Sequence, residues 1–149
     1  MPTEGEVRGA LRDVHDPEIP VLSIVDLGIV EAVRVAGARV DVELLPTVSG
    51  CPALGFMADA VRRKVRGLPG VEEVEVTFRL DRAWSTERIT AQGRLALTSF
   101  GIAPPGPTPA CPYCGSTQTH SASAFGPTRC RAVYYCDACR NPFEQMKTL

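Results

Sequence analysis

The sequence lacks any long apolar run, so it offers no segment for a membrane. No stretch of its 149 residues reaches the ~18 consecutive apolar residues that a spanning helix needs. The first residues, MPTEGEVRGALRDV, include acidic side chains and no apolar core, unlike a secretory signal. We therefore expect no membrane contact and a cytoplasmic location, where thiols stay reduced and cysteines more often bind metals than form disulfides.

An excess of basic residues is also missing. The chain has a formal net charge of −1. Residues 1–109 contain 12 Lys or Arg and 15 Asp or Glu, whereas residues 110–149 contain 4 and 2. Neither part carries enough positive charge to hold a phosphate backbone by electrostatics alone. We therefore expect no nucleic-acid partner.

Several catalytic signatures are absent as well. The sequence contains no Glu-x-x-His pair for a di-iron bundle, no glycine-rich dinucleotide fingerprint and no plant-type ferredoxin spacing of cysteines. Its two histidines, His15 and His120, are distant in sequence from Cys51. A Cys–His hydrolase is therefore unsupported, although folding could bring His15 close to Cys51. The chain is not expected to be an oxygenase itself.

Proline and glycine are concentrated in one segment, GIAPPGPTPAC at 101–111, which is typical of a stiff, extended linker. This segment predicts three parts. Residues 1–101 form an α/β domain, residues 102–110 the linker, and residues 111–149 a cysteine-centred module.

The apolar patterns of the first part predict an α+β fold, a small sheet with helices on one face. Thr3 and Glu6 form a capping box at the start of the first helix. Leu80 is predicted to lie on the same buried strand face as Val74. The predicted elements, in order, are a helix from 3, strands on either side of 36–37, a helix from 52 to 67, a strand within 70–80 and a short helix that follows Trp84 and runs to Phe100.

The strongest signal is a pair of C-x2-C motifs separated by 21 residues, CPYCG at 111–115 and CDACR at 136–140. Four thiolates on two tight turns are typical of a closed, tetrahedral, structural zinc site. Iron bound by the same four sulfurs is the alternative. Because the module is short, the metal would supply much of its stability. The predicted ligands are Cys111, Cys114, Cys136 and Cys139.

Other residues of the module receive less specific predictions. Cys130 would lie about 20 Å from Cys136 along a straight strand, too far to share its metal. We interpret Cys130 as a small buried apolar residue, with a second reactive thiol as the alternative. His120 is predicted to lie in an exposed loop. Five aromatic residues are predicted to form a small core around the metal: Tyr113, Phe125, Tyr134, Tyr135 and Phe143.

Cys51 stands apart from the other cysteines, directly before Pro52 and the second predicted helix. At this N-cap position the helix dipole and unpaired N–H groups would lower the pKa of a thiol. Serine, threonine, asparagine or aspartate would cap the helix better, so a cysteine suggests another role. We interpret Cys51 as an accessible thiol that binds a metal or cluster transiently; a cysteine merely tolerated in a cap loop is the alternative.

Two segments, DPEIPVLSIVDLGIV at 16–30 and TVSGCP at 47–52, resemble the metal–sulfur cluster biosynthetic family of iron–sulfur assembly proteins. The segments DRAWSTERIT at 81–90 and GIAPP, together with the cysteine module, look like its PaaD branch, which is component D of the phenylacetyl-CoA epoxidase (phenylacetate-CoA oxygenase) system. The matching residues are Asp16, Pro17, Glu18, Asp26, Leu27, Gly28, Thr47 and Cys51.

The resemblance implies a non-catalytic accessory factor that helps to mature or repair a metal centre of this epoxidase, in its iron–sulfur reductase or its di-iron subunit. It implies that Cys51 contacts iron or a cluster, supported by Thr47, Asp26 and Glu18; for the last two, a turn-cap or helix-end role is the alternative. Since a cluster takes about four protein ligands, a second protomer in a homodimer or the client would supply the rest.

Three other functions remain open from the sequence. The chain could be a purely structural subunit of the oxygenase complex. It could be a thiol enzyme that uses Cys51, or a zinc ribbon that binds nucleic acid.

Overall fold

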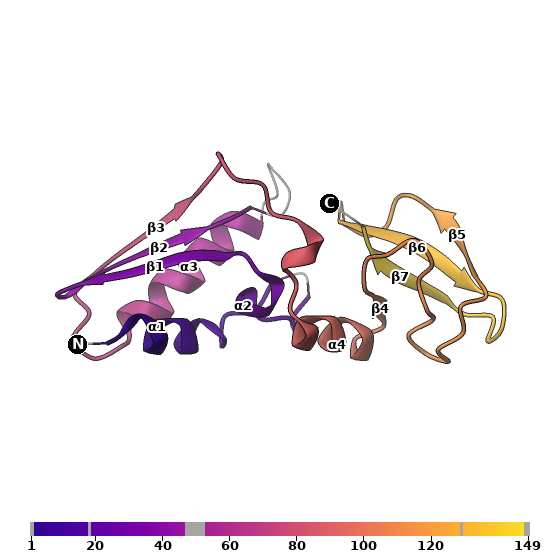
Figure 1. Cartoon of the computed structure of the whole chain (residues 1–149), viewed down its shortest axis with the longest axis horizontal. Helices are drawn as coiled ribbons and strands as arrows, with labels where there is room; N and C mark the ends of the chain where they lie inside the picture. Colours follow the sequence, from indigo (N-terminus) through magenta and orange to yellow (C-terminus); the bar gives the residue numbers. More distant parts are fainter. Residues whose placement is uncertain (1, 18, 47–52, 129, 148–149) are drawn as a thin grey trace.

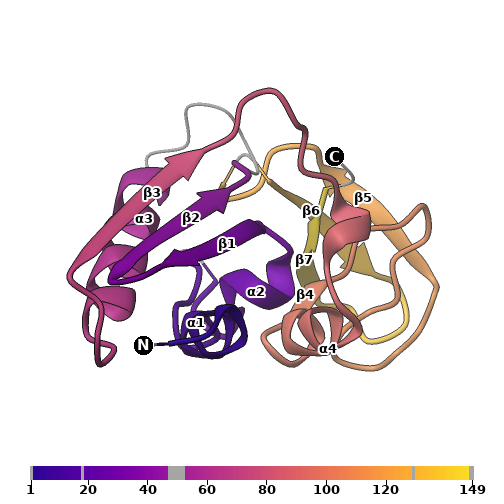
Figure 2. The same ribbon diagram turned by 60° about the vertical axis from the view of Figure 1, so that its left-hand side comes forward.

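The computed structural model describes residues 2–17, 19–46, 53–128 and 130–147. The described chain contains a three-stranded sheet of order β1-β2-β3 and a four-stranded sheet of order β4-β7-β6-β5. The two sheets occupy opposite ends of the molecule, with the helices α2 (Ile24–Leu27) and α4 (Ala91–Ser99) between them (Figures 1 and 2).

The first helix, α1 (Glu4–Leu11), begins as predicted. The Glu6 backbone N–H donates to Thr3 Oγ1 at 3.1 Å, and the Thr3 backbone N–H donates to Glu6 Oε2 at 2.8 Å. This capping box satisfies two N–H groups that lack partners within the helix. The apolar residues Val7 and Leu11 are buried beneath it.

The first sheet confirms the three predicted strands. β1 (Val30–Ala36) and β2 (Arg39–Leu44) form an antiparallel hairpin, and β3 (Glu73–Phe78) pairs in parallel with β2. The crossover is α3 (Ala53–Arg66), which packs with α1 on one face of the sheet (Figure 1). No helix within the described ranges is long and apolar enough to cross a membrane.

Two predictions after β2 are wrong. Leu80 is 82% exposed, because β2 ends at Leu44 and gives β3 no partner beyond Phe78. The helix predicted to follow Trp84 begins only at Ala91, after a short 3-10 helix, η1 (Thr86–Arg88). Thr90 sets this start, since its Oγ1 accepts a hydrogen bond from the Gly93 N–H at 3.0 Å.

The sequence patterns did not predict α2. Ser23 caps this four-residue helix by accepting from the Val25 N–H at 3.2 Å, and Gly28 ends it with a φ of 80°. A Cβ on Gly28 would lie 2.3 Å from the Arg88 carbonyl oxygen, so glycine is required there twice over. One turn is too short to show a helical period in the sequence.

The second sheet is built from β5 (Thr119–Ser123), β6 (Arg131–Cys136) and β7 (Pro142–Met146), which form an antiparallel meander. The short strand β4 (Ile102–Ala103) adds to β7 in parallel. β4 lies within the segment predicted as a linker, and Gln145 Nε2 donates to the carbonyls of Pro104 and Gly106 at 3.2 and 2.8 Å. This segment is therefore attached to the second sheet along part of its length.

The two sheets share buried apolar residues. The large core of the first part includes Leu97 of α4, Ile102 of β4 and Met146 of β7. A small second core consists of Ala103, Cys111, Cys136 and Phe143, with Tyr134 packed against it.

The predicted aromatic core is confirmed only for Phe143 and Tyr134. Phe143 is buried in the small core and Tyr134 packs against it, but Tyr113 is 61% and Phe125 is 85% exposed. Two cysteines and Ala103 complete the small core, so the apolar contribution to this module is slight.

Candidate functional site

The two C-x2-C motifs form two matching tight turns. The Gly115 N–H donates to the Cys111 carbonyl, and the Arg140 N–H donates to the Cys136 carbonyl, both at 2.8 Å. Each turn closes on a left-handed residue, since φ is 77° at Gly115 and 60° at Arg140. Arg140 is the one non-glycine residue of the described chain with a positive φ. The paired turns direct all four thiols to one point.

Backbone and amide N–H groups point at the sulfur atoms of these turns. The Tyr113 N–H lies 3.4 Å from Cys111 Sγ, and the Cys139 N–H lies 3.5 Å from Cys136 Sγ. Asn141 Nδ2 donates to Cys139 Sγ at 3.4 Å. Such donors stabilise the negative charge of thiolate ligands, as is usual in the outer shell of a metal site.

The spacing of the four sulfur atoms fits a tetrahedral metal ion. Cys111 Sγ lies 3.7 Å from Cys139 Sγ, and Cys114 Sγ lies 3.6 Å from Cys136 Sγ. All four atoms lie within 4.8 Å of one another. Zn–S bonds of about 2.3 Å in a tetrahedron place the sulfurs about 3.8 Å apart, close to the two shortest separations. The four predicted ligands are thus brought together as a candidate metal centre.

The crowded thiols differ in acidity. A hydrogen bond from the Asn141 side chain, with help from Cys111 and Cys136, lowers the pKa of Cys139 to about 7, although burial opposes it. A backbone hydrogen bond from Ser116 lowers the pKa of Cys114, but burial and bonding to the other thiols raise it overall to about 11. Of these two thiols, Cys139 is therefore the easier to convert to a thiolate.

Cys130 lies outside this cluster. It directly precedes β6, is half-buried, and has its Sγ 3.1 Å from Thr128 Oγ1. His120 lies on β5 and not in the predicted loop, with its Nδ1 3.1 Å from Asp137 Oδ2 and its ring 5.5 Å from that of Tyr135. The loop prediction is wrong because His120 pairs with Tyr135 across the sheet.

The structure describes one of the four candidate site residues of the first part. Cys51, Thr47 and Glu18 lie outside the described residues. The carboxylate of Asp26 is 15% exposed, accepts from Thr90 Oγ1 at 2.9 Å and forms an ion pair with Arg12 at 3.3 Å. Asp26 therefore ties α2 to the end of α1 and to the start of α4, and its supporting role for Cys51 stays a prediction.

Sequence reasoning missed a clamp on the end of α2. Three successive backbone carbonyls, those of residues 26 to 28, each accept a hydrogen bond from the segment 84–90. The donors are the Thr90 N–H to Asp26 at 2.9 Å, Trp84 Nε1 to Leu27 at 2.9 Å and Arg88 Nε to Gly28 at 2.8 Å. These bonds satisfy carbonyls that have no partner within a helix end.

Glu31 strengthens the same contact. Its carboxylate, 12% exposed, pairs with Arg82 and with Arg88, the latter at 2.8 Å. The clamp joins residues 60 positions apart, so no local sequence signal could have revealed it.

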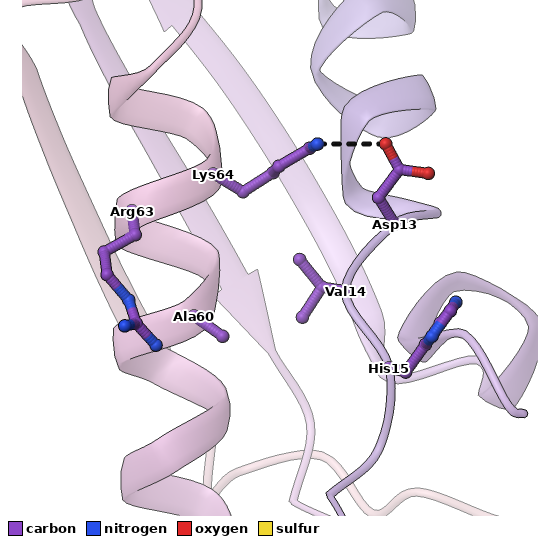
Figure 3. Close-up of a pocket in the computed structure, with 6 residues that line it drawn as sticks. All are labelled: Asp13, Val14, His15, Ala60, Arg63 and Lys64. Atoms are coloured by element: carbon purple, nitrogen blue, oxygen red, sulfur yellow. Dashed lines mark ion pairs between the residues drawn. The ribbon is translucent and has the colours of Figure 1, made fainter. Parts of the chain in front are cut away.

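A cleft of about 370 Å³ lies between α3 and the segment that follows α1 (Figure 3). Val14 and Ala60 line it with apolar side chains, and Lys64 Nζ pairs with Asp13 Oδ2 at 2.9 Å across one side. His15, exposed at the other side, is bridged through its backbone to Ser23. Among the described residues that line this cleft, only Asp13 and His15 could bind a metal, and the cysteine cluster is the one group of three or more such side chains found in the described part of the chain.

Two family models match separate parts of the chain. The family model for iron–sulfur cluster assembly proteins matches residues 4–78. The model for the PaaD zinc beta ribbon domain matches residues 102–147.

Two relatives cover most of the chain. A protein of Escherichia coli (strain K12), named as the D subunit of a 1,2-phenylacetyl-CoA epoxidase, is 39% identical over 99% of this chain and 94% of its own length. An Fe-S protein maturation auxiliary factor of Porphyromonas gingivalis (strain ATCC BAA-308 / W83) is 35% identical over 65% of this chain and 92% of its own.

Solved structures resemble the first part. A domain of unknown function from Bacillus anthracis is 30% identical, with a TM-score of 0.60, over 63% of this chain and 90% of its own. A conserved hypothetical protein from Thermotoga maritima is 29% identical, with a TM-score of 0.56, over 67% and 95%. The chain therefore belongs to the iron–sulfur cluster assembly protein family, in the PaaD branch that carries a C-terminal zinc ribbon.

Proposed function

We propose that this protein is a non-catalytic accessory factor that helps to mature or repair a metal centre of a phenylacetyl-CoA epoxidase. The observation that carries the proposal is the 39% identity over 99% of the chain to a protein named as the D subunit of that epoxidase. A second relative is named as an Fe-S protein maturation auxiliary factor, which favours maturation as the task.

The two groups of cysteines have separate roles in this proposal. Cys111, Cys114, Cys136 and Cys139 hold one zinc ion, which supplies no open coordination position and stabilises the ribbon. Iron in the same four sulfurs is the alternative. Cys51 contacts iron or a cluster, and Thr47 and Glu18 support it, as the family resemblance implies. Asp26 holds the neighbouring segment in place, since its carboxylate already has two partners.

The client is an iron–sulfur reductase or a di-iron subunit of the epoxidase. A single thiolate cannot hold a cluster, which takes about four protein ligands. The remaining ligands therefore come from the client, or from a second copy of this chain in a homodimer. Because most of the ligands lie outside this chain, the cluster site is transient. The protein itself carries out no redox step.

Anaerobic reconstitution with iron and sulfide tests the role of Cys51. Wild type, Cys51→Ser and the matched control Cys130→Ser are compared by metal analysis and absorption spectra. All three are expected to keep about one zinc per chain, because the four ribbon thiols are intact. Only wild type and Cys130→Ser should also take up iron with sulfur-to-iron bands. Equal iron uptake by Cys51→Ser would refute the assignment.

A structural subunit without cluster chemistry is the second candidate, favoured by the word subunit in the name of the Escherichia coli relative. It predicts that Cys51→Ser leaves epoxidase activity intact in a co-expressed complex. It also predicts that loss of the ribbon metal releases the protein from that complex. Reduced activity with Cys51→Ser in an intact complex would favour the maturation factor instead.

A further inference from the structure

The ribbon metal centre and α2 are joined by an unbroken series of contacts through β4 and α4. We propose that the metal-loaded ribbon holds α2 in position, so that the metal content of the ribbon controls the conformation of the Val-Asp-Leu-Gly segment at residues 25–28. As a statement about regulation, this inference rests on the proposed function. Its test measures the protection of backbone amides and not the uptake of a cluster, so this inference and the proposed function can fail independently.

The first step runs from the metal centre to β4. Ala103 is fully buried in the small core formed with Cys111, Cys136 and Phe143, so two metal ligands pack directly on this strand. Its neighbour Ile102 belongs to the large core of the first part, together with Leu97 of α4. β4 therefore has one residue in each core, and displacement of the cysteines would be transmitted to both.

A second contact supports this step. Tyr113, between the two cysteines of the first turn, lies over Gly101 at the end of α4. A Cβ at Gly101 would lie 3.0 Å from Tyr113 Oη, which shows how closely the metal-binding turn approaches the helix end. The turn, α4 and β4 are thus packed as one unit.

The second step runs from α4 to α2 (Figure 2). Thr90, the N-cap of α4, receives the Gly93 N–H on its Oγ1 and donates the same hydroxyl to Asp26 Oδ1, while its N–H donates to the Asp26 carbonyl. A Cβ on Gly93 would lie 2.8 Å from the Asp26 carbonyl oxygen, so the two helices are tightly packed there. Any shift of the first turn of α4 must move Asp26.

The third step runs from α2 to the end of β2. Ile29, directly after Gly28, is buried, and its carbonyl accepts a hydrogen bond from the Leu45 N–H at 2.8 Å. Leu45 precedes Pro46, the last described residue before the segment 47–52. The position of α2 is therefore tied to the position of Leu45, two residues before this segment.

The ribbon depends on the metal for its stability, so the metal can control this series of contacts. The ribbon's own core contains four buried residues, two of which are cysteines, so without the cation little holds the two turns together. Removing it loosens the surface on which Ala103 rests and lowers the opening free energy of α4 and α2. The first sheet has its own strand pairing and should keep its protection as long as the chain stays folded.

Amide hydrogen exchange of the full chain tests the inference, with zinc, after EDTA treatment and after zinc is restored. Loss of zinc should accelerate exchange about tenfold in 26–29 and 91–103, reversibly, and leave 39–44 unchanged. Trp84, the single tryptophan, bonds the Leu27 carbonyl and should shift its emission to longer wavelength in parallel. Acceleration confined to 109–147 would overturn the inference.

A variant pair keeps the test decisive if zinc removal unfolds the whole chain. Zinc-loaded Thr90→Val loses the hydroxyl that joins α4 to Asp26 and should show faster exchange in 26–29 with unchanged zinc content. Thr98→Val, an exposed site whose hydroxyl bonds only within α4 to Arg94, is the matched control and should behave as wild type. Thr90→Ser should restore protection. Equal exchange of 26–29 in Thr90→Val and Thr98→Val would refute the second step.

Discussion

At Gly101 the backbone has a φ of 87°, a conformation that costs any residue with a Cβ about 1–2 kcal/mol. The added Cβ would also press on Tyr113 Oη at 3.0 Å. We expect Gly101→Ala to lower the free energy of unfolding of the zinc-loaded protein by about 2–3 kcal/mol, the sum of this backbone strain and the displacement of Tyr113. Denaturant unfolding followed by Trp84 fluorescence measures the change.

Gly37 provides the matched control, since its φ is 62° and nothing lies within 4 Å of its Cβ position. Gly37→Ala should therefore cost only the backbone strain of about 1–2 kcal/mol. In a Tyr113→Phe background, which lacks the hydroxyl, Gly101→Ala should cost no more than Gly37→Ala. An equal cost for Gly101→Ala with and without the hydroxyl would contradict the contact with Tyr113.

The metal ligands could be predicted from the sequence because each depends on local geometry. A C-x2-C turn directs two sulfurs by itself, and the left-handed residue that ends each turn was visible as Gly115 in one case. The role of Asp26 was not decidable, because its partners Arg12 and Thr90 lie 14 and 64 positions away. The role of Cys51 remains a prediction, since the structure does not describe it.

Among the elements, the contrast between α1 and α4 can be tested with glycine. Gly9 is exposed in α1, and a Cβ there would meet nothing within 4 Å, so Gly9→Ala should stabilise the protein by about 0.5–1 kcal/mol through helix propensity. Gly93 of α4 faces the Asp26 carbonyl, so Gly93→Ala should instead destabilise it by about 1–3 kcal/mol.

Thermal unfolding of the two variants shows the difference as melting temperatures that move in opposite directions, by about 2–4 °C per kcal/mol for a chain of this size. If Gly93→Ala raised the melting temperature as Gly9→Ala does, α4 would not be packed tightly on α2. The comparison is informative because helix propensity alone predicts the same gain for both.

Helices and strands with a local sequence signal were predicted, whereas those that depend on contacts with distant residues were not. The capping box of α1 and the alternation in β2 are local, and both were confirmed. The start of α4 was misplaced because Thr90 is held by Asp26 of another helix. β4 was predicted as part of a linker because two residues acquire strand geometry only by pairing with β7.

For the whole molecule, the two parts are joined more firmly than a proline-rich linker suggested. Met146 of the second sheet and Ile102 of β4 are buried in the core of the first part. Because the two parts share buried residues, unfolding of one part exposes apolar surface of the other. The zinc-loaded protein should therefore unfold as one cooperative unit.

Calorimetry of wild type, Cys114→Ser and Cys130→Ser tests whether the two parts unfold together. Wild type and Cys130→Ser should bind about one zinc and melt in a single transition, with a calorimetric enthalpy equal to the van't Hoff enthalpy. Cys114→Ser should lose the metal and melt in a broader, earlier transition, because β4 and α4 lose the surface against which they pack. Two separate transitions in zinc-loaded wild type would show that the ribbon folds independently, and the shared core would then contribute little to stability.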